Sequence, residues 1–270
     1  MSRSFERESQ NVRTAAVAGR FYPANPAELH RMIEGFLREA KPSTTSAPKA
    51  VIAPHAGYVY SGPIAASAYA RFAPAHDVIK RVVLLGPSHY VAFRGLATTS
   101  AEAWTTPLGA VPVDTEAARQ VTALPQVSVM DEAHAQEHSL EVQLPFLQIV
   151  LGEFKIVPLV VGDAEDEEVA QVLEMLWGGD ETRLVISSDL SHYYNYARAR
   201  ELDAATARAI EHLRPRDIGH EQACGRVPIR GMLRAAKTHG LHVETVDLRN
   251  SGDTAGPRSE VVGYGAWTFE

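Results

Sequence analysis

The sequence predicts a single α/β domain in which a central mixed or mostly parallel sheet carries helices on both faces. Three short runs of valine, isoleucine, leucine and alanine begin at residues 50, 82 and 184. Runs of this kind are typical of strands that are buried on both faces. Segments with helical spacing alternate with them, and no repeat or long linker divides the 270 residues. We therefore expect a polar N-terminal segment over residues 1–13 and one folded domain over residues 14–270.

The first helix is expected to begin at Pro26, because Asn25 is a favourable N-cap and proline suits the first helical position. Residues 41–49 are rich in proline, serine and threonine, which predicts a surface loop before the first buried strand. A helix over residues 61–72 and a strand that ends before Gly86 are expected to follow.

The alternation of strands and helices continues to the end of the chain. Residues 89–113 contain glycines and a proline between short β-like pieces, which predicts loops and a hairpin. Residues 130–133 are typical of a turn. Residues 139–151 are helical by pattern, with Pro145 either bending the helix or lying near its start. The remaining expected strands cover residues 154–161, 183–186, 242–248 and 260–269, and the remaining expected helices cover residues 165–177, 202–213 and a stretch that begins near Cys224.

Composition and charge argue against several classes of function. The formal charge of −7 gives no electrostatic reason to bind nucleic acid or an anionic membrane. No apolar stretch reaches the ~18–20 residues of a membrane span. The polar start of the sequence lacks signal-peptide and transit-peptide features, and the one cysteine excludes an internal disulfide. We therefore expect a cytoplasmic protein with no nucleic-acid partner and no membrane association.

Three histidines stand just past the ends of the three apolar runs. They are His55, His89 and His192, and prolines, glycines and serines around them favour tight turns. In an open α/β sheet, ligands bind outside the carboxyl ends of the strands. A single histidine in this place is more often a structural residue. Three in the same context predict a shared metal or catalytic site.

Cys224 is the natural fourth member of this site. It lies where a helix is expected to begin, and the positive end of a helix dipole lowers the pKa of a thiol and favours the thiolate that metals bind. The alternative interpretation is a buried, inert cysteine.

A competing motif occurs at residues 134–138, where the sequence matches the H-x-x-E-H pattern of a class of zinc peptidases. The turn expected just before it and the nearby Pro145 shorten any helix that would carry both histidines, so we disfavour this interpretation. Glu137 and His138 remain candidates to line a substrate pocket. The sequence contains no P-loop, no G-x-G-x-x-G fingerprint and no G-x-S-x-G elbow.

Six ordered motifs resemble those of the Memo-like family and extend over nearly the whole sequence. They are AGRFY (18–22), IAPHAGYVY (52–60), LGPSH (85–89), EHSLE (137–141), SSDLSH (187–192) and CGRVPI (224–229). The resemblance implies a fold similar to that of the class III extradiol dioxygenases, which hold non-haem iron(II) with two histidines and a carboxylate.

The resemblance also implies roles for single residues. His55 and His89 match the two histidine ligands, and Cys224 falls at the third metal-contacting position of Memo-like proteins. His192 matches the histidine that acts as acid and base in the dioxygenases. We expect the neighbouring Asp189 to orient the ring of His192.

Two departures from these patterns refine the expectations. A thiolate in place of the carboxylate makes the site softer, which favours copper(I), zinc or thiolate-ligated iron and argues against ring cleavage. Phe21 stands at the position where the animal member of the Memo-like family has a tryptophan that contacts peptide. Tyr60 matches a tyrosine of that protein. Phenylalanine lacks the indole donor, which weakens the expectation of peptide binding. We expect Phe21 and Tyr60 to wall a cleft that takes a small-molecule or peptide ligand. Bacterial and archaeal relatives are often encoded beside a radical-SAM protein, which implies a functional link.

Three hypotheses for function follow. The leading one is an iron(II)- or copper-dependent oxidoreductase in which His55, His89 and Cys224 hold one ion and His192 is the general acid and base. The second is a module that binds a phosphorylated or acidic peptide in the same pocket without turnover. The third is a zinc-dependent hydrolase that uses the same ligands to activate water.

Overall fold

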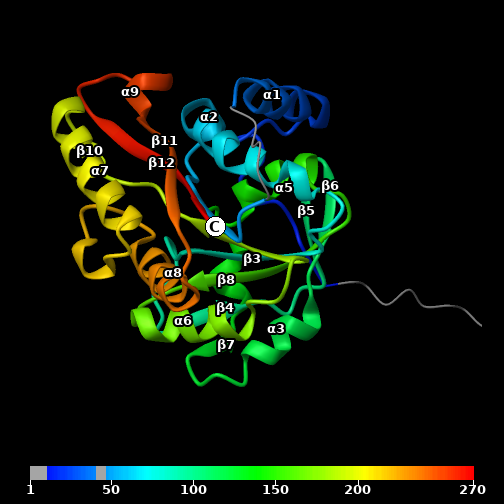
Figure 1. The fold of residues 1–270 in the computed structure, drawn as a ribbon. Helices are drawn as coiled ribbons and strands as arrows, with labels where there is room; N and C mark the ends of the chain where they lie inside the picture. The colour runs from blue at the N-terminus through cyan, green and yellow to red at the C-terminus, as the bar shows by residue number, and fades with distance from the viewer. Residues whose placement is uncertain (1–10, 41–46) are drawn as a thin grey trace, which may run out of the picture.

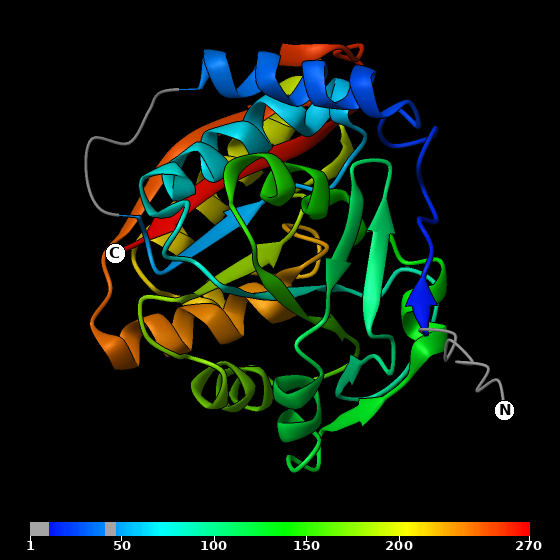
Figure 2. The ribbon, with the colours of Figure 1, turned by 90° about the vertical axis from the view of Figure 1, so that its right-hand side faces the viewer.

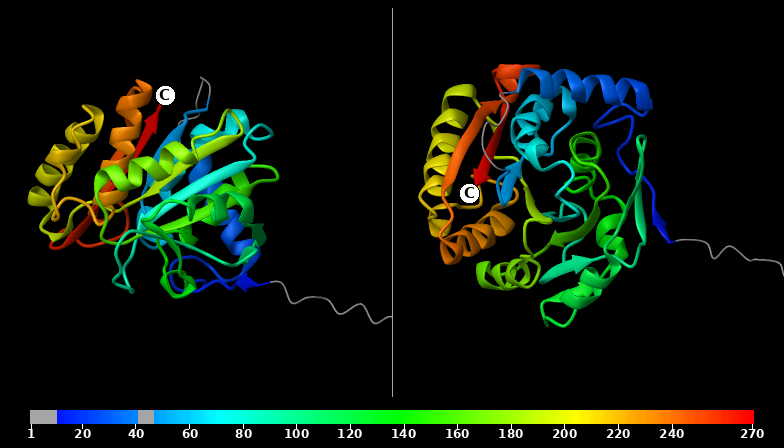
Figure 3. Two further views of the ribbon diagram at one scale, coloured as in Figure 1. Left: turned by 90° about the horizontal axis from the view of Figure 1, so that it is seen from below. Right: turned by 45° about the vertical axis from the view of Figure 1, so that its right-hand side comes forward.

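A computed structural model describes residues 11–40 and 47–270 of the chain (Figure 1). Within these residues the strands form a main sheet of nine strands and a small sheet of three. The main sheet lies between layers of helices, as the views in Figures 2 and 3 show. The predicted α/β fold, with one domain and a mixed sheet, is confirmed.

Four parallel strands form the centre of the main sheet. In spatial order they are β2 (Ala50–Ala53), β9 (Thr182–Ser187), β3 (Arg81–Pro87) and β8 (Lys155–Val161). Ile186 of β9 is in register with Ile52 of β2 on one side and with Leu85 of β3 on the other, and all three are fully buried. Because these strands run in the same direction, their carboxyl ends meet at one edge of the sheet.

Outer strands of both directions make the sheet mixed. β12 (Val261–Phe269) runs antiparallel to β2 and also pairs with β10 (His192–Tyr194) and β11 (Val243–Asn250). At the other end, β4 (Leu96–Thr98) runs antiparallel to β8, and β7 (Val127–Val129) pairs with β4 in parallel.

Helices cover both faces of the main sheet and give each face its own apolar core (Figure 2). One face is covered by α1 (Pro26–Glu39), α2 (Tyr58–Tyr69) and α5 (Leu144–Val150). The other is covered by α3 (Thr115–Val121), α6 (Asp166–Met175), α7 (Tyr196–Glu211) and α8 (Arg226–His239). The short helices are α4 (Asp131–Ala135), α9 (Ser251–Thr254) and 3-10 turns at Ala70–Ala75, Glu141–Gln143 and Pro215–Asp217.

Some expected helix boundaries are confirmed and others are wrong. α1 begins at Pro26 as expected, and the side chain of Asn25 caps it. α7 begins at Tyr196 rather than at residue 202, because Asn195 provides an N-cap there. The turn expected over residues 130–133 is wrong, since α4 begins at Asp131.

The expected N-terminal segment and the expected loop over residues 41–49 fall partly outside the described residues, which exclude 1–10 and 41–46. β1 (Val12–Arg13) belongs to the fold, because it pairs with β5 (Ala103–Thr106) of the small sheet. β5 also forms the expected hairpin with β6 (Gly109–Pro112). Among the described residues, no helix has the length and apolar character needed to cross a membrane.

Candidate metal centre

The three predicted histidines follow three neighbouring strands of the main sheet. His55 comes two residues after β2, His89 comes two residues after β3, and His192 lies beyond the end of β9, which stands between them. The rings of His55 and His89 meet edge to face, with their centroids 5.2 Å apart. The ends of β2 and β3 thus bring His55 and His89 together at one edge of the sheet, whereas His192 begins β10 and is not among the described histidines whose ring nitrogens cluster.

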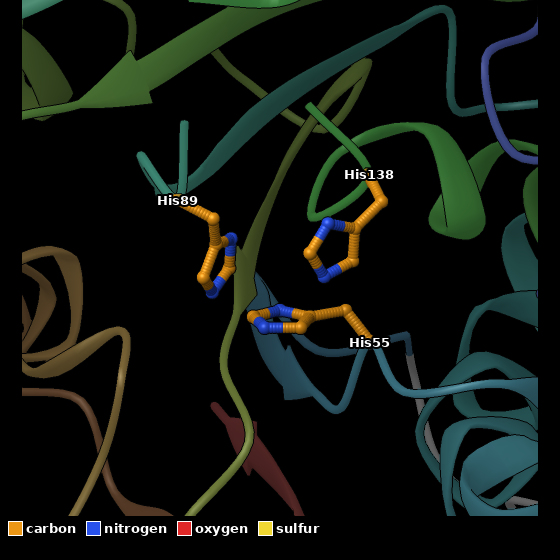
Figure 4. Close-up of side chains that lie close together, drawn as sticks. All are labelled: His55, His89 and His138. Atoms are coloured by element: carbon orange, nitrogen blue, oxygen red, sulfur yellow. The ribbon is translucent and has the colours of Figure 1, made fainter. Parts of the chain in front are cut away.

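A further histidine, His138, lies in the same cluster. Figure 4 shows its ring facing those of His55 and His89, although it comes from the loop after α4. One ring nitrogen of each of the three residues lies within 4.8 Å of the others, and the rings of His89 and His138 stack with centroids 4.5 Å apart. The sequence analysis predicts His138 as a residue that lines a substrate pocket, not as part of the metal site. The H-x-x-E-H motif was the available signal for its position.

Cys224 lies next to His55, in the turn before α8. Its Sγ lies 3.3 Å from Nε2 of His55 and 3.5 Å from the carbonyl oxygen of Asp189. The next residue, Gly225, allows this close approach, because a Cβ there would lie 2.7 Å from the carbonyl oxygen of Ser187. The sulfur of Cys224 thus lies beside the ring of His55, although the two residues are 169 positions apart in the sequence.

The expectation that the helix dipole lowers the pKa of Cys224 is wrong for the metal-free protein. Burial raises the pKa of this thiol to about 12, and the carboxylate of Asp189 adds to the effect. α8 begins at Arg226, so the sulfur is outside its first turn. A bound cation would lower the pKa of the Cys224 thiol, because it stabilises the thiolate directly.

The ring of His89 is oriented by Glu137. This carboxylate is buried, and its oxygens accept hydrogen bonds from Nδ1 of His89 (2.8 Å), from the backbone N–H of His89 (2.6 Å) and from that of Ser139 (2.9 Å). Burial alone would raise the pKa of Glu137, but the hydrogen bonds from His89 outweigh it and lower the pKa to about 2. The structure thus places Glu137, expected to contact substrate, behind His89, where it directs Nε2 toward the cluster.

Asp189 and His192 differ in one respect from expectation. Asp189 accepts a hydrogen bond from the backbone N–H of His55 (2.7 Å), and its other oxygen lies 4.0 Å from Nε2 of that histidine. The ring of His192 is oriented by the carbonyl of Leu190, which lies 2.8 Å from Nδ1, rather than by Asp189. The expected role of Asp189 as the orienting residue of His192 is therefore replaced by a role beside His55.

One of the two aromatic residues expected to wall a cleft, Phe21, packs against the cluster. The rings of Phe21 and His138 are 4.6 Å apart, and the carbonyl of Phe21 accepts the backbone N–H of Tyr58 at the start of α2. Tyr60, two residues further on, is exposed. The side chain of His55 is 2% exposed, whereas that of His89 is 28% exposed. The cluster is therefore accessible from the side of His89.

A model of the Memo-like protein family matches residues 13–268, which is nearly the whole chain. The chain belongs to the Memo-like family. A MEMO1 family protein of Aquifex aeolicus is 38% identical over 94% of this chain and 97% of its own length. One from Methanopyrus kandleri is also 38% identical, over 95% of this chain and 98% of its own length. One from Nitrosopumilus maritimus is 34% identical over 96% of this chain and 99% of its own length.

The donor atoms in and beside this cluster are of the kinds that bind a transition metal ion. Two ligands bound to the same ion by bonds of ~2.0–2.3 Å lie about 3.3–3.6 Å apart in tetrahedral geometry. The distance of 3.3 Å between Sγ of Cys224 and Nε2 of His55 has this value, and one ring nitrogen of each of His55, His89 and His138 lies within 4.8 Å of the others. Among the residues that the structure describes, none forms a hydrogen bond with Nδ1 of His138, although this atom is buried. Imidazole and thiolate donors suit iron, copper and zinc rather than magnesium or calcium.

The loop of the Memo-like fold that carries Asp189 and His192 is held by Asp203 of α7. The Asp203 carboxylate accepts the backbone N–H of Ser191 at 3.1 Å and is 3% exposed. It packs so closely on β12 that a Cβ at Gly263 would lie 2.1 Å from it. Burial raises the pKa of Asp203 to about 6.

Replacing Asp203 with asparagine is expected to stabilise the protein above pH 6. The folded wild type binds the Asp203 proton more tightly than the unfolded chain, so its stability falls as the pH rises from 3.8 to about 6. Asparagine keeps the acceptor for Ser191 without the buried charge. We expect a gain of about 1–3 kcal/mol in the free energy of unfolding near pH 7.5 and almost none near pH 4. Urea unfolding measures both values, and a gain independent of pH would contradict the assignment.

Proposed function

We propose that this Memo-like protein binds one iron or copper ion and acts as a metal-dependent oxidoreductase. His55, His89 and Cys224 are the proposed ligands, and His138 is an additional donor. The observation that carries the proposal is the convergence of three imidazoles and a thiol from four separate segments. The rings of His55 and His89 are both bonded through Nδ1, to Ser187 and to Glu137. Their Nε2 atoms are therefore available to a metal, an arrangement typical of metal-binding histidines.

The bound ion would supply electron transfer and polarise a ligand at an open coordination position. The side chains of the protein would transfer protons and position the ligand. His192 holds or releases a proton at Nε2, because its Nδ1 is bonded to the carbonyl of Leu190. Phe21 packs against His138, and we propose that it and the exposed Tyr60 wall the approach by which a small molecule or a peptide side chain would enter.

Metal analysis of variants tests the ligand set. We expect that His55→Ala and Cys224→Ala each lower the metal content of protein purified without oxygen by at least tenfold, since each removes a donor from a site with few alternatives. His30→Ala, which changes an exposed histidine of α1, is the control and is expected to retain the wild-type content. An X-ray anomalous map locates the ion. Equal metal content in all four proteins would contradict the proposal.

The electrostatics of the site argue against the alternative of a phosphopeptide module without metal. Burial lowers the pKa of His55 well below its ordinary value and that of His138 to about 4, so both rings are neutral near pH 7. The charged groups that most affect them are histidines and the carboxylates of Glu137 and Asp189. A metal-free site of this kind does not attract an anion. Titration with phosphate should therefore give binding only after metal is added. Tight binding to the metal-free protein would favour the module instead.

Elemental analysis distinguishes the proposed iron or copper oxidoreductase from the remaining alternative, a zinc-dependent hydrolase. Zinc suits the same donors, and it would activate water rather than transfer electrons. Zinc as the metal of protein purified without added metal, with no reactivity toward dioxygen, would favour the hydrolase.

A further inference from the structure

We infer that Ser187 and Gln143 fix the tautomer of His55, so that the proton is on Nδ1 and the lone pair of Nε2 faces the candidate metal centre. Both are positioning residues, because they act through the ring of His55. The inference concerns the metal-free ring, and only its consequence for metal affinity rests on the proposed function.

The hydrogen bonds of Gln143 allow only one orientation of its side-chain amide. Its Nε2 lies 3.0 Å from the carbonyl oxygen of Pro54, which can only accept a hydrogen bond. The amide must therefore point its NH₂ group toward Pro54. The same NH₂ group lies 2.8 Å from Oγ of Ser187, and Oε1 on the far side accepts the hydroxyl of Tyr69 at 2.7 Å. Gln143 thus donates to Ser187.

The Ser187 hydroxyl has a single proton, and its neighbours determine where that proton is donated. Oγ lies 2.6 Å from the carbonyl oxygen of Ser139, which also can only accept. Ser187 therefore donates its proton to Ser139, while Gln143 occupies one of its two lone pairs. The hydroxyl has one lone pair left and no second proton to give.

The ring of His55 takes the remaining place. Its Nδ1 lies 2.8 Å from Oγ of Ser187 and must donate, because Ser187 can only accept there. Ser187, Gln143 and Ser139 have no exposed surface, and His55 is 2% exposed, so no water competes for these bonds. A neutral imidazole with its proton on Nδ1 carries its lone pair on Nε2, the atom that lies 3.3 Å from Sγ of Cys224.

His55 and His89 thus reach the same tautomer by different means. Glu137 accepts from Nδ1 of His89 as a carboxylate, whereas Ser187 accepts from Nδ1 of His55 as an uncharged hydroxyl. A hydroxyl can also donate, so only the two backbone carbonyls, of Pro54 and Ser139, enforce its role here. Removing the Ser187 hydroxyl would leave the ring free to take the other tautomer.

Nuclear magnetic resonance of metal-free protein with ¹⁵N-labelled histidine tests the inference. Two-bond ¹H–¹⁵N correlations report which ring nitrogen is protonated, and the His55→Asn variant identifies the signals of His55. We expect wild-type His55 to be protonated on Nδ1 and Ser187→Ala to lower that fraction at least twofold. Thr206→Val removes a buried hydroxyl of α7 that bonds to Leu202 and Gln222 and not to His55, and it is expected to keep the wild-type tautomer.

Rescue and metal affinity complete the test. Ser187→Thr keeps the hydroxyl and is expected to restore the Nδ1–H tautomer. Ser187→Ala is expected to weaken metal binding by about 10–100-fold, as loss of the hydrogen-bond partner of a histidine ligand typically does. A wild-type ring protonated on Nε2, or an unchanged tautomer in Ser187→Ala, would overturn the inference. If Ser187→Ala does not fold, the wild-type spectrum still decides. An Nδ1–H tautomer in protein that binds no metal would leave the inference standing and refute the proposed function.

Discussion

Replacing Glu141 with alanine is expected to lower the free energy of unfolding by about 3–5 kcal/mol, because it leaves a buried cation without its partner. Glu141 has no exposed surface and forms an ion pair of 2.7 Å with Arg13, whose side chain is 7% exposed. Its oxygens also accept the backbone N–H groups of Ala16 and Val17 and the hydroxyl of Tyr22. The variant removes the acceptor for all of these donors at once.

Urea unfolding measures this loss, and two controls support the interpretation. Glu201→Ala breaks an exposed ion pair with Arg198 on α7 and is expected to change stability by less than about 0.5 kcal/mol. The double variant Arg13→Met, Glu141→Met is expected to lose less stability than the sum of the losses of Arg13→Met and Glu141→Met made separately, because it buries no lone charge. Similar losses for Glu141→Ala and Glu201→Ala would show that the buried network contributes little.

Replacing Glu137 with glutamine is expected to weaken metal binding by about 10–100-fold and to cost about 1–3 kcal/mol of stability. Glu137 accepts three N–H groups, two from His89 and one from Ser139. Glutamine offers one oxygen and places its own NH₂ group against a donor. At least one buried N–H then loses its acceptor, and the ring of His89 loses its orientation.

Competition with a chelator of known affinity measures the metal affinity of the Glu137 variant. Glu132→Gln is the matched control, because Glu132 lies on α4 in the same segment and is exposed. It is expected to keep the wild-type affinity. Unchanged affinity in Glu137→Gln would mean that His89 is held in place without the carboxylate.

Arg13 and Glu141, which form the buried ion pair, also explain how distant segments are brought together. Arg13 donates to the carbonyl oxygens of His134 and Glu137, which are 121 and 124 residues away in the sequence. Glu141 binds the segment that leads to Phe21, whose ring packs on His138. The loop with Glu137 and His138 and the segment with Phe21 are thus held by one buried ion pair. No local pattern in the sequence predicts this pairing.

Local patterns predicted the elements that depend on neighbouring residues. The N-cap at Asn25 and the apolar runs of the central strands were recognisable, because capping and burial on both faces leave clear signals. The start of α7 was missed by several residues, since its first turns are polar and only the cap at Asn195 marks them. The short helix α4 was missed because its five residues carry no apolar period.

The sequence by itself determined the fold class, the family and the strand-end positions of His55 and His89, because parallel strands bring their carboxyl ends to one edge whatever the loops do. The tertiary structure alone decided that His138 joins them, that Glu137 faces His89 rather than a substrate pocket, and that burial raises the pKa of Cys224. These properties arise from contacts between loops far apart in the chain, and desolvation depends on every atom packed around a group. Neither is encoded in the spacing of residues along the sequence.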